Sequence, residues 1–215
     1  MRNHVSYQLW DGVTPQTITS STDANPVVVT KAAHGLTDGG LYQIFGHTTN
    51  VAVNGIWKVE VVNSSTFKLK DINTGAYVTG SGGGAGASGV IVPAPKIALV
   101  SDFTHAELSF DTSSAFNGTV KIAGSLGKPL SAESTHGDTP NFGATVSPSN
   151  PYSFVQIINL ATNAGVDGAT GITSAGTDLD NLYEININAL KYICPIVTAW
   201  TAGKIYARLT LYSND

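Results

Sequence analysis

Charged side chains are scarce in this chain of 215 residues. Only 12% of the residues are charged, and the formal net charge is −4; this share is about half of what an average soluble domain carries. Lysine and arginine form no cluster, so electrostatic binding to the phosphates of a nucleic acid is not expected. The surface must be covered by serine, threonine, asparagine and glycine instead. Neutral polar groups lose less free energy than charges when a neighbour covers them, so this composition favours a protein that packs against other proteins, with a stable extracellular β-domain as the alternative.

Cysteine and long apolar runs are missing as well. The single cysteine, Cys194, excludes an internal disulfide framework, and its place in the apolar run 192–197 predicts a buried thiol. No apolar run approaches the roughly 20 residues that span a bilayer. The first ten residues lack the apolar segment of a signal peptide. We therefore expect a protein that is made in a cytoplasm and does not associate with a membrane.

Helical periodicity is nearly absent, because glycine, proline, asparagine or serine–threonine clusters interrupt almost every stretch. The strongest helix candidate, residues 182–188, alternates apolar and polar side chains with a period of two and so predicts a half-buried strand. With 42% hydrophobic residues, the chain has enough apolar surface for a real core. The sequence predicts an all-β protein.

A glycine-rich stretch, residues 80–89, separates two parts of the chain. The apolar run 90–92 follows at once, which favours a long hairpin loop over a plain linker, and Pro93-Ala94-Pro95 then ends the unit. The predicted organisation is an N-terminal arm (1–19), a small β-barrel or sandwich module (20–95) and a jelly-roll-like β-sandwich domain (96–215).

Short apolar runs and turn sequences place the strands. In the small module we expect strands at 27–30, 41–45, 56–62 and 66–69, with Asn54-Gly55 as the clearest turn. In the larger domain we expect strands at 103–110, 119–124, 154–159, 183–188, 193–199 and 204–212. Asn117-Gly118 predicts a turn there, and Thr201-Ala202-Gly203 predicts a tight hairpin with Trp200 as a lid on the core.

Two segments are predicted to contact partners. The arm carries Tyr7 and Trp10 among polar residues; a free arm would expose the indole, so we expect it to dock on a partner or on the chain's own second domain. A long polar loop at 131–148 contains His136 and Asp138, and loops of this length in compact domains are usually functional or mobile.

Motifs for catalysis and metal binding are not found. Gly-x-Ser-x-Gly is missing, and none of the five histidines pairs at metal-ligand spacing. For His34 we predict a structural hydrogen bond. The acidic loop 165–180 does not match a calcium-binding loop, and a solvated loop is the preferred interpretation. Nothing pairs two carboxylates as glycan hydrolysis requires. We expect no enzyme activity, no cofactor and no metal.

The small module resembles a β-module of phage tail and virion proteins. The resemblance covers residues 24–92 and depends on His34-Gly35-Leu36, on Asn54-Gly55-Ile56-Trp57 and on Thr66-Phe67-Lys68-Leu69. The module is also similar to the first catalytic-cysteine half-domain fold of ubiquitin-activating enzymes. No ubiquitin chemistry is implied, since Cys194 lies outside the matching region.

The larger domain is similar to a recurrent β-sandwich of phage proteins. The matching segments are 116–126, 186–193 and 197–205, which include Phe116-Asn117-Gly118-Thr119 and Val197-Thr198-Ala199-Trp200. Such sandwiches occur in capsid-associated, adaptor and tail proteins alike.

Together the two resemblances imply a structural protein of a tailed-bacteriophage particle. We expect a capsid decoration or cement protein that is a homo-oligomer, binds other virion proteins (the major capsid protein first) and ends in the virion. A tail, neck or fibre-base component is the alternative within that class. A carbohydrate-binding module, with Trp10, Trp57 or Trp200 exposed for stacking on sugars, is the alternative outside it.

Overall fold

The computed structural model describes residues 4–85, 89–125 and 153–213, and most of them lie in antiparallel β-strands. Within this part of the chain the one helical element is a 3-10 turn, η1 (Val51–Val53). No helix among these residues is long and apolar enough to cross a membrane. The all-β prediction is confirmed.

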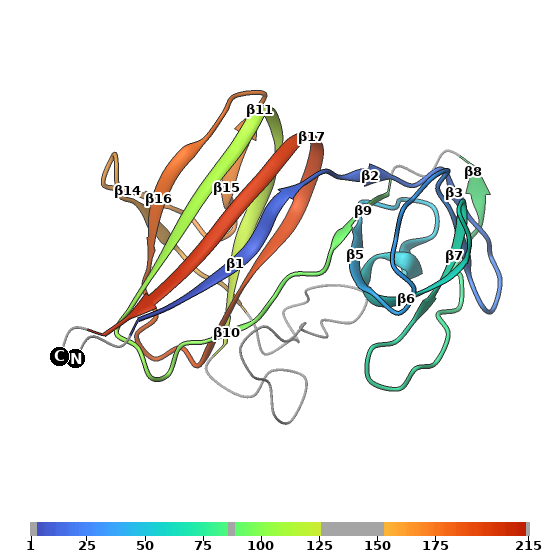
Figure 1. Ribbon diagram of the computed structural model, residues 1–215, viewed down its shortest axis with the longest axis horizontal. Coiled ribbons are helices and arrows are strands. Elements are labelled where there is room, and N and C mark those ends of the chain that lie inside the picture. The colour runs from blue at the N-terminus through green and yellow to red at the C-terminus, as the bar shows by residue number, and fades with distance from the viewer. Residues whose placement is uncertain (1–3, 86–88, 126–152, 214–215) are drawn as a thin grey trace. The chain divides into compact units, whose positions relative to one another are not determined.

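The described residues divide into two compact units (Figure 1). The smaller unit holds residues 15–85 and 89–94, and the larger unit holds residues 4–14, 95–125 and 153–213. The chain passes between the units at Pro15 and at Pro95. Residues 1–19 were predicted as one separate arm, but their described part is shared between the units.

Eight strands form the sheet of the smaller unit, in the order β2-β9-β5-β6-β7-β4-β3-β8. Their bounds are β2 (Gln16–Thr17), β3 (Ser20–Ser21), β4 (Val28–Thr30), β5 (Leu41–Phe45), β6 (Gly55–Asn63), β7 (Thr66–Lys70), β8 (Gly84–Ala85) and β9 (Val90–Pro93). Strands β4 to β7 lie where the sequence predicts them, to within one residue at each end.

Alternation of apolar and polar residues builds the core of the smaller unit. In β7, Phe67 and Leu69 are fully buried while their neighbours are half-exposed, as a period of two requires. They pack with Val29 of β4, Ile44 of β5 and Trp57 of β6 in one apolar cluster. Burial of aliphatic and aromatic side chains of this size contributes about 1.5–3 kcal/mol each, so this cluster is what holds the short strands together.

The glycine-rich stretch does not form the predicted hairpin. Strand β9 follows it, as expected, but β9 pairs with β5 and β2, which both precede the stretch by many residues. Gly84 and Ala85 form β8, which pairs with β3. Residues without large side chains fit against another backbone here, because a Cβ on Gly80 or Gly83 would lie within 3 Å of the chain at residues 22–23.

Nine strands form the sheet of the larger unit. Six of them follow the order β1-β17-β11-β16-β13-β14, while β10 also pairs with β17, and β12 and β15 also pair with β11. The bounds are β1 (His4–Val13), β10 (Ala98–Leu99), β11 (His105–Ser125), β12 (Ser153–Phe154), β13 (Ile157–Asn159), β14 (Ala164–Val166), β15 (Ile172–Ala175), β16 (Asp180–Ile185) and β17 (Tyr192–Tyr212).

Strands β11 and β17 are 21 residues long and pair with each other from end to end, from His105↔Tyr212 to Ser125↔Tyr192 (Figure 1). The ladder is irregular only in its middle, where its register shifts between Ser113 and Val120. The shorter strands attach to one half or the other: β16 to the first half of β11, and β15 and β12 to the second half. The long pair of strands therefore runs through both parts of a curled sheet, the part that contains β16 and the part that contains β12 and β15.

The turns predicted at 117–118 and 201–203 are wrong. The two segments lie opposite each other where the register of the long pair shifts and the sheet bends. Asn117 pairs with Ala202, and Gly118 pairs with Trp200, so both sequences continue their strands. The glycines serve close approach instead of chain reversal: a Cβ on Gly118 would lie 2.5 Å from the Ala199 carbonyl oxygen. Trp200 is 1% exposed and its Nε1 donates to the carbonyl of Ala202, which agrees with its predicted place on the core.

Replacing Gly203 by alanine should destabilise the larger unit. Gly203 has φ +83°, and an added Cβ would lie 2.6 Å from the Cα of Phe116 across the bend. We expect a loss of about 2–4 kcal/mol in the free energy of unfolding, measured by urea denaturation. Gly176→Ala is the matched control, since Gly176 has φ +93° but no atom within 4 Å of the added Cβ; it should lose about 1 kcal/mol. Equal losses in the two variants would contradict the steric argument.

Candidate functional site

Strand β1 forms an edge of the larger sheet. Among the described residues it pairs with β17 alone, from His4↔Tyr212 to Val13↔Ile205. Among the residues that the structure describes, no strand pairs with the backbone on its other side, which is the side to which a further strand would add. Tyr7, one of the predicted partner contacts, lies on this strand.

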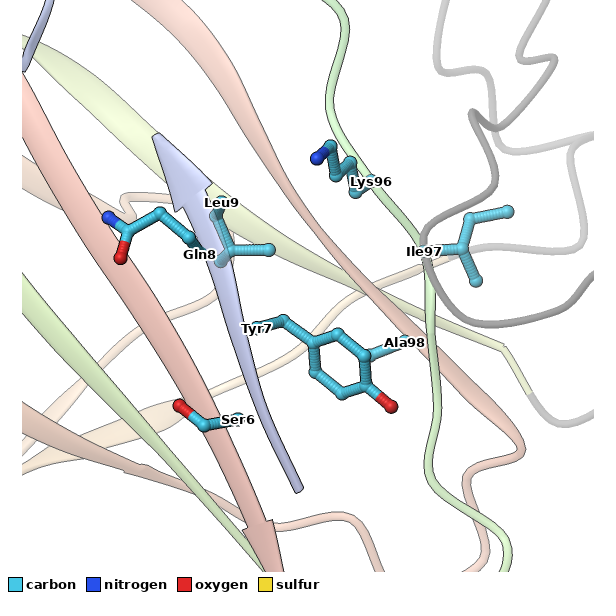
Figure 2. Close-up of a pocket in the computed structure, with 7 residues that line it drawn as sticks. All are labelled: Ser6, Tyr7, Gln8, Leu9, Lys96, Ile97 and Ala98. Carbon is cyan, nitrogen blue, oxygen red and sulfur yellow. The ribbon is translucent and has the colours of Figure 1, made fainter. Parts of the chain in front are cut away.

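A cleft of about 300 Å³ opens along this edge of β1 (Figure 2). Its lining residues are Ser6, Tyr7, Gln8 and Leu9 of β1 and Lys96, Ile97 and Ala98 of the facing segment. The Tyr7 ring points from β1 toward Ala98 (Figure 2). Burial raises the pKa of the Tyr7 phenol, because the phenolate would lose hydration. Leu9, Ile97 and Ala98 are buried, while Ser6, Gln8 and Lys96 are exposed. The cleft thus has an apolar floor, a polar rim and one cation.

The prediction that Trp10 contacts a partner is wrong. Its side chain is 2% exposed, so the strand docks on the chain's own larger unit, which was the second of the two expected outcomes. The cause is a bulge between Gln8 and Trp10 in the pairing with β17. The extra residue lets both Leu9 and Trp10 face inward, where simple alternation would have exposed one of them. His136 and Asp138 lie outside the described residues.

Stacking on sugars by exposed tryptophans has no basis in this fold. Trp10, Trp57 and Trp200 are 2%, 7% and 1% exposed. The Nε1 of Trp57 also donates a hydrogen bond of 2.7 Å to the Val53 carbonyl, which fixes the ring in the core of the smaller unit. The carbohydrate-binding alternative loses the residues on which it depended.

No metal centre is assembled in the part of the chain that the structure describes, since no three His, Cys, Asp or Glu side chains converge there. His34 forms the structural hydrogen bonds predicted for it: Nε2 contacts the Asn63 carbonyl at 2.8 Å, and Nδ1 accepts from the Leu36 amide. Cys194 is the buried thiol that was expected, and burial raises its pKa well above the usual range. Asp167 accepts the backbone amides of Ala169 and Thr170, so it closes its own turn.

A serine–histidine pair that the sequence did not reveal lies in the smaller unit. Ser21 Oγ lies 3.1 Å from His47 Nε2, and Asn50 Nδ2 donates to the same oxygen at 2.9 Å. All three side chains are buried. Burial lowers the pKa of His47, which keeps the imidazole neutral.

The hydrogen bonds of His47 exclude a role as general base for Ser21. The backbone amide of Asn50 donates to His47 Nδ1 at 3.1 Å, and an amide can only donate. In the neutral ring the proton is then on Nε2, which donates to Ser21 Oγ. A catalytic base would need to accept the serine proton at that nitrogen. The pair holds the loop 47–54 against β3, and His47 does not activate the Ser21 hydroxyl as a nucleophile.

Glu60 of the smaller unit is the centre of a cluster of charged side chains. It pairs with Lys68 and Lys70 and accepts a hydrogen bond of 2.8 Å from the Tyr77 hydroxyl. The hydrogen bond from Lys70 is the largest cause that lowers the pKa of Glu60 to about 2. Both lysines also lie over the Tyr77 ring. The carboxylate is therefore fully paired, while the cluster of one carboxylate and two lysines keeps a net charge of +1.

Comparisons with known proteins find a weak structural likeness and no match to a family model or a curated protein. Among solved structures it is similar to the K1 cleaved adhesin domain of Lys-gingipain from Porphyromonas gingivalis W83, at 11% identity over 99% of both chains and with a TM-score of 0.28. A likeness of that degree carries no statement about function.

Acidification should destabilise the smaller unit through His47. The pKa of His47 is lowered on folding, so below about pH 6.5 the unfolded chain binds more protons than the folded one. The free energy of unfolding therefore decreases as the pH decreases. Urea midpoints at pH 7.5 and 5.5 should differ less in His47→Gln than in the unchanged protein. His47→Gln should also lose about 1–3 kcal/mol at neutral pH, because Ser21 and the Asn50 amide lose their partner. His105→Gln, in the larger unit, is the control; an equal change in its pH dependence would refute the assignment to His47.

Proposed function

We propose that this protein is a structural component of a tailed-bacteriophage particle, in first place a capsid decoration protein. It is made in the host cytoplasm and binds the head as a homo-oligomer, against the major capsid protein. It acts by adding contact area at the junctions between capsid subunits, and it needs no cofactor and no nucleic acid.

The observation that carries this proposal is that the three motif segments of the small module meet in one place. The His34 ring packs edge-on against Phe67, with their centroids 5.3 Å apart. Phe67 and Trp57 belong to the same apolar cluster. One residue of each motif segment, His34, Trp57 and Phe67, therefore lies in or against this core, as expected if the resemblance reflects a shared structural module.

The distribution of charge supports an assembly role. The net charge is only −4 over 215 residues, and the Glu60 carboxylate is already paired with two lysines. Contacts made by such a surface depend on shape and on neutral hydrogen bonds, in the way that permanent protein interfaces do.

Quantifying the protein in purified particles of the source phage tests the proposal. A decoration protein should be present in hundreds of copies and appear as regular density on the head in cryo-electron microscopy, because capsid junctions repeat over the whole shell. Tens of copies or fewer, located at the tail or neck, would support the alternative structural role. Absence from purified particles would refute both.

Binding to the particle should depend only weakly on salt. Few charges are available for the interface, and surface ion pairs contribute about 0–1 kcal/mol each. Particles washed in about 0.1 M and about 1 M sodium chloride should retain the same amount of the protein within a factor of about two. Release at the higher concentration would show that charge pairs hold it in place.

A further inference from the structure

The edge of β1 lacks the features that usually prevent strand addition. The segment His4–Leu9 contains no proline, lysine, arginine, aspartate or glutamate, and its pairing with β17 is regular up to Gln8. Edge strands are normally protected by such residues or by bulges. In β1 the bulges come later, after Gln8 and after Asp11.

The backbone groups of this segment alternate in direction. Tyr212 lies between His4 of β1 and His105 of β11, and its carbonyl accepts the amide of Thr104 on the β11 side. In an antiparallel ladder, the residue opposite a group that turns away also turns away. The N–H and C=O groups of His4, and by alternation those of Ser6 and Gln8, are thus directed to the open edge.

We propose that the cleft beside β1 takes up one extended segment of a partner protein, which adds to the sheet as a further strand and places a carboxylate near Lys96. This inference deepens the assembly role proposed above and rests on it for the source of the partner. Backbone pairing with Ser6 and Gln8 would supply affinity, and the Tyr7 ring with Ile97 and Ala98 would receive an apolar side chain.

The charge of the cleft favours such a segment over a second copy of this chain. Lys96 is the one charged side chain among the lining residues, so it is complementary to an acidic side chain. The segment His4–Leu9 of a second copy contains no aspartate or glutamate, so it would bring no acidic side chain to Lys96.

Short blocked peptides test the proposal on the isolated full-length protein. The probe is a peptide of about nine residues in which threonine and valine alternate around a central glutamate; a second peptide has lysine in the centre, and a third carries two prolines. Amide exchange, followed by NMR on isotope-labelled protein, should slow about tenfold at Ser6 and Gln8 with the glutamate peptide, and by less with the lysine peptide at the same concentration. The proline peptide should give no protection, because it cannot pair.

Two variants separate edge pairing from other binding. Ser6→Pro removes an amide that does not pair with β17, so the protein should fold but bind at least about tenfold more weakly, whereas Ser6→Ala keeps the amide and should bind normally. Lys96→Glu should reverse the preference of about threefold for the glutamate peptide over the lysine peptide, and this variant decides the matter if Ser6→Pro does not fold.

Several outcomes would overturn the proposal: protection at other amides, equal binding of the proline peptide, or no change with Lys96→Glu. A dimer in sedimentation that Ser6→Pro abolishes would assign the edge to a second copy and would overturn it too. None of these results depends on whether the protein is found in phage particles, so this proposal and the proposed function can fail separately.

Discussion

Two strands of 21 residues, β11 and β17, pair along their whole length, and the larger unit is organised by that pairing. Each short strand pairs with one of them directly, except β13, which pairs with β16, and β14, which pairs with β13. A ladder of this length cannot stay flat, because strand twist accumulates with every residue. It bends where Gly118 and Trp200 oppose each other, and the glycines there allow the backbones to approach. The curled sheet and its aromatic core of Phe110, Phe116 and Trp200 follow from that bend.

The sequence predicts local features of this protein well and long-range features poorly. The strands of the small module and the structural role of His34 follow from alternation and turn chemistry within short windows. Asn117-Gly118 and Thr201-Ala202-Gly203 have equally good turn chemistry, yet they continue their strands. Glycine permits both a reversal and a bend, and only the opposing strand, about 80 residues away, decides between them.

The candidate site could not have been predicted for the same reason. Its two walls, residues 6–9 and 96–98, are far apart in the sequence. They are brought together because β1 and β10 pair with opposite ends of β17, which bends between them. Tyr7 was expected at a contact surface and does line the cleft, but Trp10, three residues later, is buried by a one-residue bulge. A bulge is set by the pairing of two strands, and the pattern of one strand does not contain it. Lys96, Ile97 and Ala98 carry no motif at all; proline at 93 and 95 marks only the end of the preceding unit.

The polar chemistry of the two units is consistent with a protein that works through its backbone. In the smaller unit, Ser21, His47 and Asn50 satisfy one another, and the direction of their hydrogen bonds leaves no reactive group. Glu60 and its lysines are likewise paired. In the larger unit, main-chain amides and carbonyls of β1 are directed to the side on which no described strand pairs with it. Backbone groups are strong donors and acceptors whatever the side chain, so they can bind another chain without charge. A chain with few charged residues can therefore still assemble specifically, provided that it keeps one strand edge open and shapes a cleft beside it.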